Sequence, residues 1–427
     1  MGSRLLWRRF ATAAGLYAST AFGILGTVVA ANSLPLVEFG VFATALVVAG
    51  FFQVLLDLTV EESLTKYGFR YSETGEWGKL RVLFRRALQG KLAGGLLATL
   101  VLAALAPFAD SIFGSDGLTS AFLLAAMLPL LQAPENVAGT ALLLRGRYDL
   151  RAYTQVSSQA LRLAAIVIGT RFGVEETLIA LAVAQALATV VVGTVGLVAF
   201  RRFPRESGRL APQDRRELVA FVLQSSASTG LISLRGMLAP VLLGIAAGPV
   251  QVGLFRIAQA PQSGFAAASS PVRLILLTEN TRDWEQGQTA KVLADVRRYS
   301  LVAATVCAVT VPLFFWLMPE FIELVVPRYL DATDAARVML LAAAVQLVFG
   351  WSKSLPVSIG QPKLRLYTHG IETAVLLPLV VVLGLEWGVT GAAFAVLAGS
   401  LVFAAAWMVL YARLLRDDAR GRPVLSP

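Results

Sequence analysis

The sequence contains few charged residues and almost none of the residue types that build active sites. Asp, Glu, Lys and Arg make up 15% of its 427 residues, against about 25% in soluble domains. It has one histidine, His369, and one cysteine, Cys307, which excludes an intrachain disulfide. There is no phosphate-binding glycine loop and no pair of acids in a polar loop domain. We therefore expect no enzyme, no cofactor and no metal site.

Long apolar runs recur from Ala11 to Tyr411, and hydrophobic residues make up 56% of the chain, with a mean hydropathy of +0.69. A membrane-spanning helix needs about 20 apolar residues to cross about 30 Å of hydrocarbon. The runs leave no room for a separate water-soluble domain. The net charge of +10 does not indicate a nucleic-acid partner, because Lys and Arg collect in the cytoplasmic loops of membrane proteins.

The apolar runs predict an all-α, polytopic membrane protein in the plasma membrane with twelve transmembrane helices. The predicted spans are 11–31, 39–59, 87–107, 118–139, 152–170, 178–200, 218–246, 250–278, 300–318, 336–359, 366–385 and 390–411.

The distribution of basic residues predicts the orientation. Of 37 Lys and Arg residues, 28 lie at the two ends or in the loops that follow even-numbered spans, three (Arg171, Arg328 and Arg337) lie in the other loops, and six lie within spans. Because cytoplasmic loops carry the excess of Lys and Arg, both termini should be cytoplasmic. Omitting any one span would place every later loop on the wrong side.

Three pairs of segments repeat at nearly one spacing and predict an internal duplication. They are 146–154 and 360–368 (G-x-x-x-L-R-x-Y-T, offset 214), 39–42 and 252–255 (offset 213), and 173–174 and 388–389 (offset 215). With six helices each, the two halves have the same orientation and are parallel repeats. The predicted organisation is an N-terminal lobe (1–202), a basic linker (203–217), a C-terminal lobe (218–412) and a cytoplasmic tail (413–427).

Charged residues within the spans are candidate site residues, because such a residue costs roughly 2.5–3.5 kcal/mol at the bilayer centre. Arg162 shares a helical face with Gln155, Ser158 and Gln159. Arg235 lies near the middle of its own span. Neither span contains an acid to pair with these arginines.

The span 250–278 carries a polar stripe that should face the protein interior rather than lipid. Its members are Arg256, Gln259, Ser263, Ser270 and Arg273. We expect a central cavity between the lobes, lined by Arg162, Arg235 and Arg256, that binds an anionic group such as a phosphate or diphosphate.

Some of these charges have a plainer interpretation. Arg273, Lys91 and Lys353 lie close to cytoplasmic ends, where snorkelling of the side chain into the interface is favoured. The acids found at membrane level are Asp57, Glu61, Glu62 and Glu372, all near the cytoplasmic side. Asp57 or Glu372, the latter one turn from His369, are candidates for a proton or sodium site, although a solvated cluster at the cytoplasmic rim is the favoured interpretation.

Several segments resemble bacterial polysaccharide and O-antigen flippases of the multidrug/oligosaccharidyl-lipid/polysaccharide exporter superfamily. The resemblance lies in 38–42, 56–58, 64–67, 240–244, 252–255, 360–363 and 387–393, and it spans nearly the whole chain. It implies a two-lobed flippase that moves a polyprenyl-diphosphate-linked glycan to the outer leaflet. Glycosyltransferases or a glycan polymerase are the implied partners.

Two departures and two alternatives accompany this resemblance. Residues 11–31 contain neither the acid typical of the superfamily's multidrug exporters nor the arginines typical of its lipid II flippases. One alternative function is an ion-coupled exporter of small molecules. The other is a non-transporting scaffold for glycan assembly, against which the interior arginines argue. The glycan, the coupling ion and the oligomeric state do not follow from the sequence.

Overall fold

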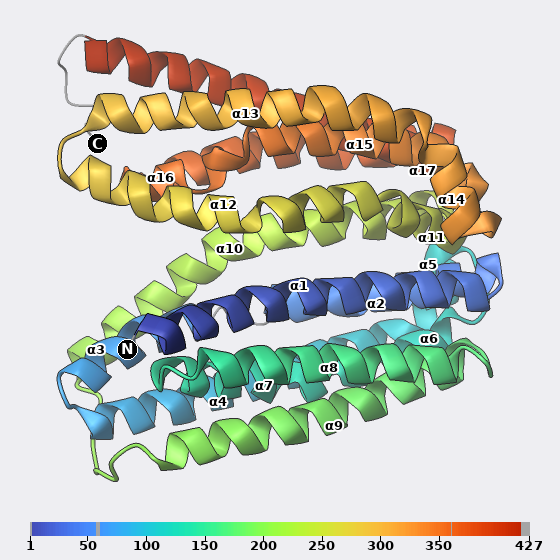
Figure 1. The fold of residues 1–427 in the computed structure, drawn as a ribbon. Helices are drawn as coiled ribbons and strands as arrows, with labels where there is room; N and C mark the ends of the chain where they lie inside the picture. Colours follow the sequence, from blue (N-terminus) through green and yellow to red (C-terminus); the bar gives the residue numbers. More distant parts are fainter. Residues whose placement is uncertain (1, 57–59, 360, 420–427) are drawn as a thin grey trace. The chain divides into compact units, whose positions relative to one another are not determined.

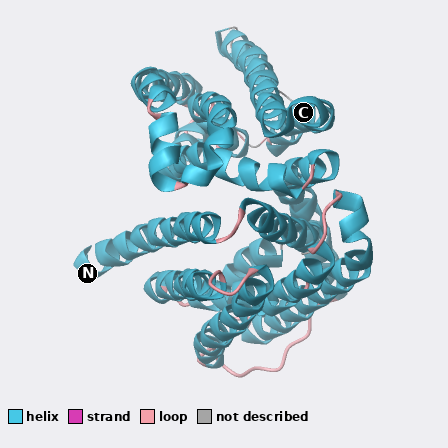
Figure 2. Cartoon of the chain, turned by 90° about the vertical axis from the view of Figure 1, so that its right-hand side faces the viewer, coloured by secondary structure: helices cyan, strands magenta, loops and turns pink. Residues whose placement is uncertain are grey.

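The computed structural model describes residues 2–56, 60–359 and 361–419, and within these ranges the chain is helical with short connections and no strand (Figures 1 and 2). Six helical segments in this part of the chain are long and apolar enough to cross a membrane, and one of them, Lys363–Arg416, is 54 residues long. The all-α, multi-pass architecture is thereby confirmed. The count of twelve spans and the side of each terminus stay predictions.

The chain divides into two compact units, residues 1–253 and 254–427. The helices of the first unit are α1 (Gly2–Ser33), α2 (Leu36–Leu56), α3 (Val60–Glu73), α4 (Trp77–Leu105), η1 (Ala106–Phe108), α5 (Ala109–Phe113), α6 (Leu118–Ala125), α7 (Met127–Leu144), α8 (Tyr148–Gly169), α9 (Val174–Arg201) and α10 (Pro212–Ala247). Helix α11 (Pro249–Ala258) crosses the division.

The helices of the second unit are α12 (Ala260–Glu285), α13 (Thr289–Trp316), α14 (Met318–Val325), η2 (Pro327–Ala332), α15 (Thr333–Val348), η3 (Gly350–Lys353), α16 (Leu355–Ser358) and α17 (Pro362–Ala419). Two of the predicted spans are merged within α17, which reverses at Gly388, a residue with φ +55°. A positive φ of this kind is open to glycine at no steric cost, so the two spans need no longer loop between them.

Prolines explain why some predicted spans are interrupted. The span 118–139 is divided at Ala126, three residues before Pro129, and the span 250–278 is divided at Gln259, two residues before Pro261. Proline has no backbone N–H, so one hydrogen bond of the helix is lost at each place. The span 336–359 is likewise divided into α15, η3 and α16.

Helix α10 packs within the first unit, against α2 and α3. The basic segment before it is held to the start of α4, where Arg81 donates hydrogen bonds to the carbonyl oxygens of Phe203 and Pro204, both at 2.8 Å. Trp77 stacks on Phe203 at 5.8 Å between ring centroids. The compact units therefore divide at residue 253, after α10. The lobe boundaries predicted from the sequence repeat need not coincide with these compact units, and they stay a prediction.

In the first unit, α8 lies between α1 and α9, and α9 also contacts α7 (Figure 1). The corner between α8 and α9 is tight, because a Cβ on Gly169 would lie 2.5 Å from the Cα of Thr177. In the second unit, Gly391 meets the carbonyl oxygen of Leu383 in the same way. These two pairs are separated by the repeat offset of 214. Both units thus close a helix corner with one glycine at the contact.

Candidate functional site

Arg162 lies on α8, and its guanidinium is held by α9. Its Nε donates a hydrogen bond to Oε1 of Gln185 at 2.9 Å, and Nη2 contacts the same oxygen. The amide of Gln185 is almost completely buried and donates to Oε2 of Glu135 on α7 at 2.9 Å and to Thr189 at 3.0 Å. The amide therefore stands between the cation and the carboxylate and bonds to both (a polar chain of Arg162, Gln185 and Glu135).

The expectation that Arg162 has no acidic neighbour is wrong. Glu135 lies within the predicted span 118–139, between Pro134 and Asn136, and belongs with the acids at membrane level. The same criterion that selected Arg162, a charge inside a span, was sufficient to find it. The pairing itself depends on Gln185, which comes from a third helix and has no charge to mark it.

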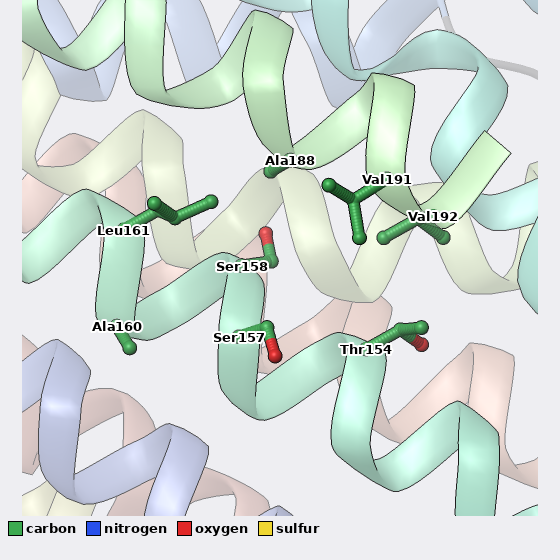
Figure 3. Close-up of a pocket in the computed structure, with 8 residues that line it drawn as sticks. All are labelled: Thr154, Ser157, Ser158, Ala160, Leu161, Ala188, Val191 and Val192. Carbon is green, nitrogen blue, oxygen red and sulfur yellow. The ribbon is translucent and has the colours of Figure 1, made fainter. Parts of the chain in front are cut away.

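The remaining residues of the predicted face on α8 differ in their surroundings. Ser158 is buried, Gln159 is half-buried and Gln155 is exposed. Residues four apart lie one above the other on a helix, so Ser158 shares with Arg162 the side that meets α9. A pocket of about 460 Å³ opens beside Ser158 between α8 and α9 (Figure 3).

The contact between α8 and α9 is called the seam below. The other predicted site residues come from other elements. Arg235 is half-buried on α10, which packs against α2 rather than α8. In the second unit, Arg256 and Ser263 are exposed and Gln259 is half-buried at the break between α11 and α12. The central cavity joining these residues stays a prediction. Two further candidates, Asp57 and the side chain of Arg273, lie outside the described residues.

Lys91 does not snorkel to the interface. Its side chain is buried, and its Nζ lies 2.6 Å from Oε1 of Glu61. The two residues come from α4 and α3, so the ion pair joins the apolar part of α4 to the short helix before it. An opposite charge at this distance compensates the cost of removing the ammonium group from water, which explains why Lys91 lies inside the packed unit.

The second unit contains a polar chain without formal charge. Gln262 on α12 donates to Oε1 of Gln346 on α15 at 2.9 Å, and Gln346 donates to the hydroxyl of Ser400 on α17 at 2.9 Å. Neither Gln262 nor Gln346 was among the predicted site residues. Gln346 is the one glutamine of the span 336–359, whereas Gln262 lies beside the polar stripe of the span 250–278, so both amides were visible as polar residues at membrane level.

His369 and Glu372 form a buried pair, with His369 Nδ1 and Glu372 Oε2 2.9 Å apart. Their side chains are 3% and 5% exposed, and the imidazole stacks on Phe403 at 4.8 Å. The expectation that Glu372 belongs to a solvated cluster is therefore wrong, while its place at the cytoplasmic rim stays a prediction. The 3.6-residue period of a helix placed the two residues on one side, but only packing against the second half of α17 buries that side.

The comparisons with known proteins fit this helical architecture. The family model described as "Polysaccharide biosynthesis protein" matches residues 9–270, more than half of the chain. No curated protein was found to be similar to this sequence.

Three solved structures share the fold over nearly all of their length. An inward-facing multidrug resistance MATE family transporter of the MOP superfamily has a TM-score of 0.69 at 13% identity, covering 94% of this chain and 95% of that one. An outward-facing form of such a transporter has a TM-score of 0.62 at 14% identity, covering 96% of each chain. A MOP superfamily transporter from Pyrococcus furiosus has a TM-score of 0.56 at 14% identity, covering 97% and 95%.

Proposed function

Because this chain belongs to the polysaccharide biosynthesis protein family, we propose that it is a flippase for a lipid-linked oligosaccharide. In this proposal it moves a polyprenyl-diphosphate-linked glycan from the cytoplasmic to the outer leaflet of the plasma membrane, for the synthesis of cell-surface polysaccharide. Alternating access is the proposed mechanism, supported by the shared fold with transporters solved in inward-facing and outward-facing forms.

The observation that carries this proposal is the placement of Arg162. Its guanidinium lies between the polar face of α8 and the apolar helix α9 and is oriented by Gln185. A diphosphate leaving water loses its hydration, and that loss must be replaced by donors inside the protein. Arginine suits this task because its planar fork can donate to two oxygens at once and stays charged at any cellular pH. The lipid tail meanwhile stays in the hydrocarbon and needs no polar path.

The test combines Arg162→Ala with Arg235→Ala in a strain depleted of the native protein. We expect surface glycan to fall strongly while the abundance of the protein in the membrane is unchanged. Arg162→Lys should restore export in part, because the charge returns without the fork. Arg171→Ala is the matched control, since Arg171 is exposed in the connection between α8 and α9. Normal surface glycan from the double variant at normal abundance contradicts the proposal.

A second candidate function is an ion-coupled exporter of small molecules, and the buried pair of His369 and Glu372 favours it. An acid held away from water beside a histidine is a group whose protonation can be linked to a conformational change. Under this alternative, Glu372→Gln abolishes pH-gradient-driven efflux of a cationic dye such as ethidium from the cells. Wild-type cells that show no such efflux exclude it.

A further inference from the structure

Helix α14 of the second unit is apolar on two sides, and only one of them is covered by protein. Met318 and Ile322, four residues apart, are buried in the unit. Leu317, Phe321 and Leu324 are exposed and follow the spacing of four and three residues that places side chains on one side of a helix. Leu324 is 83% exposed, more than any other large apolar side chain in the described part of the chain. This exposed side of α14 needs a covering other than the chain itself.

The remaining side of α14 is acidic. Glu320 and Glu323 are exposed and lie three residues apart. With about 3.6 residues per turn, the two acids follow the exposed apolar side around the helix, opposite the side of Ile322. Around the helix the order is therefore packed, exposed apolar and charged. A helix that lies in the surface of a membrane has an apolar side and a charged side next to each other in this way.

The exposed side of α14 continues the lipid-facing surface of α13. Helix α13 is long and apolar enough to cross a membrane, and α14 lies at its end, where the chain turns (Figure 1). Exposed apolar residues repeat along α13 every three or four positions and lead into the first turn of α14: Val302, Val306, Val309, Leu313 and Leu317. On a membrane-spanning helix such a stripe faces hydrocarbon. The same lipid surface is thus at hand for Phe321 and Leu324.

Two tryptophans mark the depth at which α14 begins. Trp316, the last residue of α13, is 76% exposed, and Trp387, at the turn between the two halves of α17, is 58% exposed. Both follow spans at the ends that are predicted to lie outside. Exposed tryptophans at the ends of spans are typical of the membrane–water interface. Pro319 cannot continue the hydrogen bonds of α13, so the chain turns at this depth.

Arg337 of α15 fixes the direction of the turn. Its Nε donates a hydrogen bond to the carbonyl oxygen of Phe315 at 3.1 Å, and its guanidinium lies over the ring of Phe315 at 5.1 Å. The same guanidinium pairs with Asp334 at 3.2 Å. The end of α13 is thereby tied to the first turn of α15. Because Met318 and Ile322 are also packed, the apolar side of α14 has a fixed orientation.

We propose that α14 is an interfacial helix, which inserts Leu317, Phe321 and Leu324 into the membrane–water interface and keeps its two acids in water. The partner is a lipid surface without net charge, since carboxylates beside the inserted side repel anionic headgroups. The outer leaflet is the one that the predicted topology indicates. The proposal holds for a flippase and for an exporter of small molecules alike.

The test uses spin-labelled single-cysteine variants of the full-length protein in phosphatidylcholine vesicles, in a background where Cys307→Ala removes the native cysteine. The nitroxide is attached in Leu324→Cys and, as the matched control one residue away, in Glu323→Cys. Oxygen concentrates in hydrocarbon and a nickel chelate stays in water, so the ratio of their collision rates with the label measures depth. We expect a ratio several-fold higher for Leu324→Cys than for Glu323→Cys.

Three results overturn the proposal. Equal ratios at the two positions place α14 in water. Protection of the Leu324→Cys label from both reagents shows that protein covers this side, as in an interface with a second copy. A ratio that rises when phosphatidylglycerol is added to the vesicles shows attraction to anionic headgroups, and we expect no such rise. If Leu324→Cys does not fold, Phe321→Cys takes its place with the same expected outcome.

Discussion

Two helix pairs, α8 with α9 in the first unit and the two halves of α17 in the second, differ in the side chains at their contact. In the first, α8 and α9 meet at small buried side chains, Ser158 and Ala188, and hold a polar chain with formal charges at Arg162 and Glu135. In the second, the two halves of α17 enclose Phe403, Trp407 and the buried pair of His369 and Glu372, and the polar chain through Gln346 is neutral. The predicted repeat therefore aligns two helix contacts whose facing side chains differ in size and charge.

The equivalent positions show how the difference arises. At the offset of 214, Gln155 and Ser158 correspond to His369 and Glu372. The second unit covers its ionisable pair with a ring from the facing helix, whereas the first unit has an alanine at that place and a hydroxyl beneath it. We infer a division of tasks in which the first seam holds a fixed charge and the second encloses a titratable pair.

The largest expected effect comes from removing the ring that closes the second seam. Phe403→Ala should destabilise the protein by about 3–5 kcal/mol, the usual cost of truncating a buried Phe. Ala188→Phe at the equivalent place, 215 residues earlier, should also destabilise the protein, by about 1–3 kcal/mol, because Ala188 is 1% exposed and a ring there overpacks the contact between α8 and α9. Thermal unfolding in detergent measures both. Unchanged stability of Ala188→Phe contradicts close packing at that contact.

A smaller effect should follow from breaking the two polar chains. Gln185→Leu leaves both Arg162 and Glu135 without their shared partner and should cost about 1–3 kcal/mol for each buried group left unsatisfied. Ser400→Ala removes only a neutral hydroxyl that accepts from Gln346 and should cost about 1 kcal/mol. Combining Gln185→Leu with Arg162→Leu and Glu135→Leu should recover part of the loss. No recovery in the unfolding temperature argues against a coupled chain.

The smallest effect concerns pH at connections outside the predicted spans. The carboxylate of Asp110 accepts hydrogen bonds from the hydroxyl of Thr119 and from the backbone N–H groups of Leu118 and Thr119, which lower its pKa. Its contribution to stability is present above its ordinary pKa of about 4 and is lost as the pH falls through the lowered value. Amide exchange at residues 118–122 should therefore speed up in acid, and Asp110→Asn should remove that pH dependence.

The second unit should respond at the other end of the pH scale. Burial raises the pKa of Tyr329 from 10.0 to about 12. The contribution of the neutral phenol is present below pH 10 and is lost as the pH rises through about 12. An ultraviolet titration should show several late-ionising tyrosines, because burial also raises the pKa of Tyr67, and one fewer of them in Tyr329→Phe. A normal titration of all tyrosines in the wild type contradicts burial at this connection.

Periodicity and composition were enough to predict the helices, because a membrane-spanning segment is recognisable in the sequence as an apolar run of about the same length each time. The repeated glycines at 173 and 388 lie at one helix corner in each unit, and the duplication itself stays a prediction. The interruptions at Ala126 and Gln259 were predictable in principle from Pro129 and Pro261. The burial of Lys91 could not be predicted, because its partner Glu61 lies on a helix that meets α4 only in the folded chain.

What the sequence determined by itself is therefore the membrane environment, the positions of the helices and the list of polar residues that must be accommodated among them. Each of these follows from local chemistry, namely the cost of exposing backbone or charge to hydrocarbon. Only the tertiary structure decided which polar residues meet. Arg162, Gln185 and Glu135 come from three helices, and their bonds cannot be read from spacing along one chain, because packing between helices depends on every facing side chain at once.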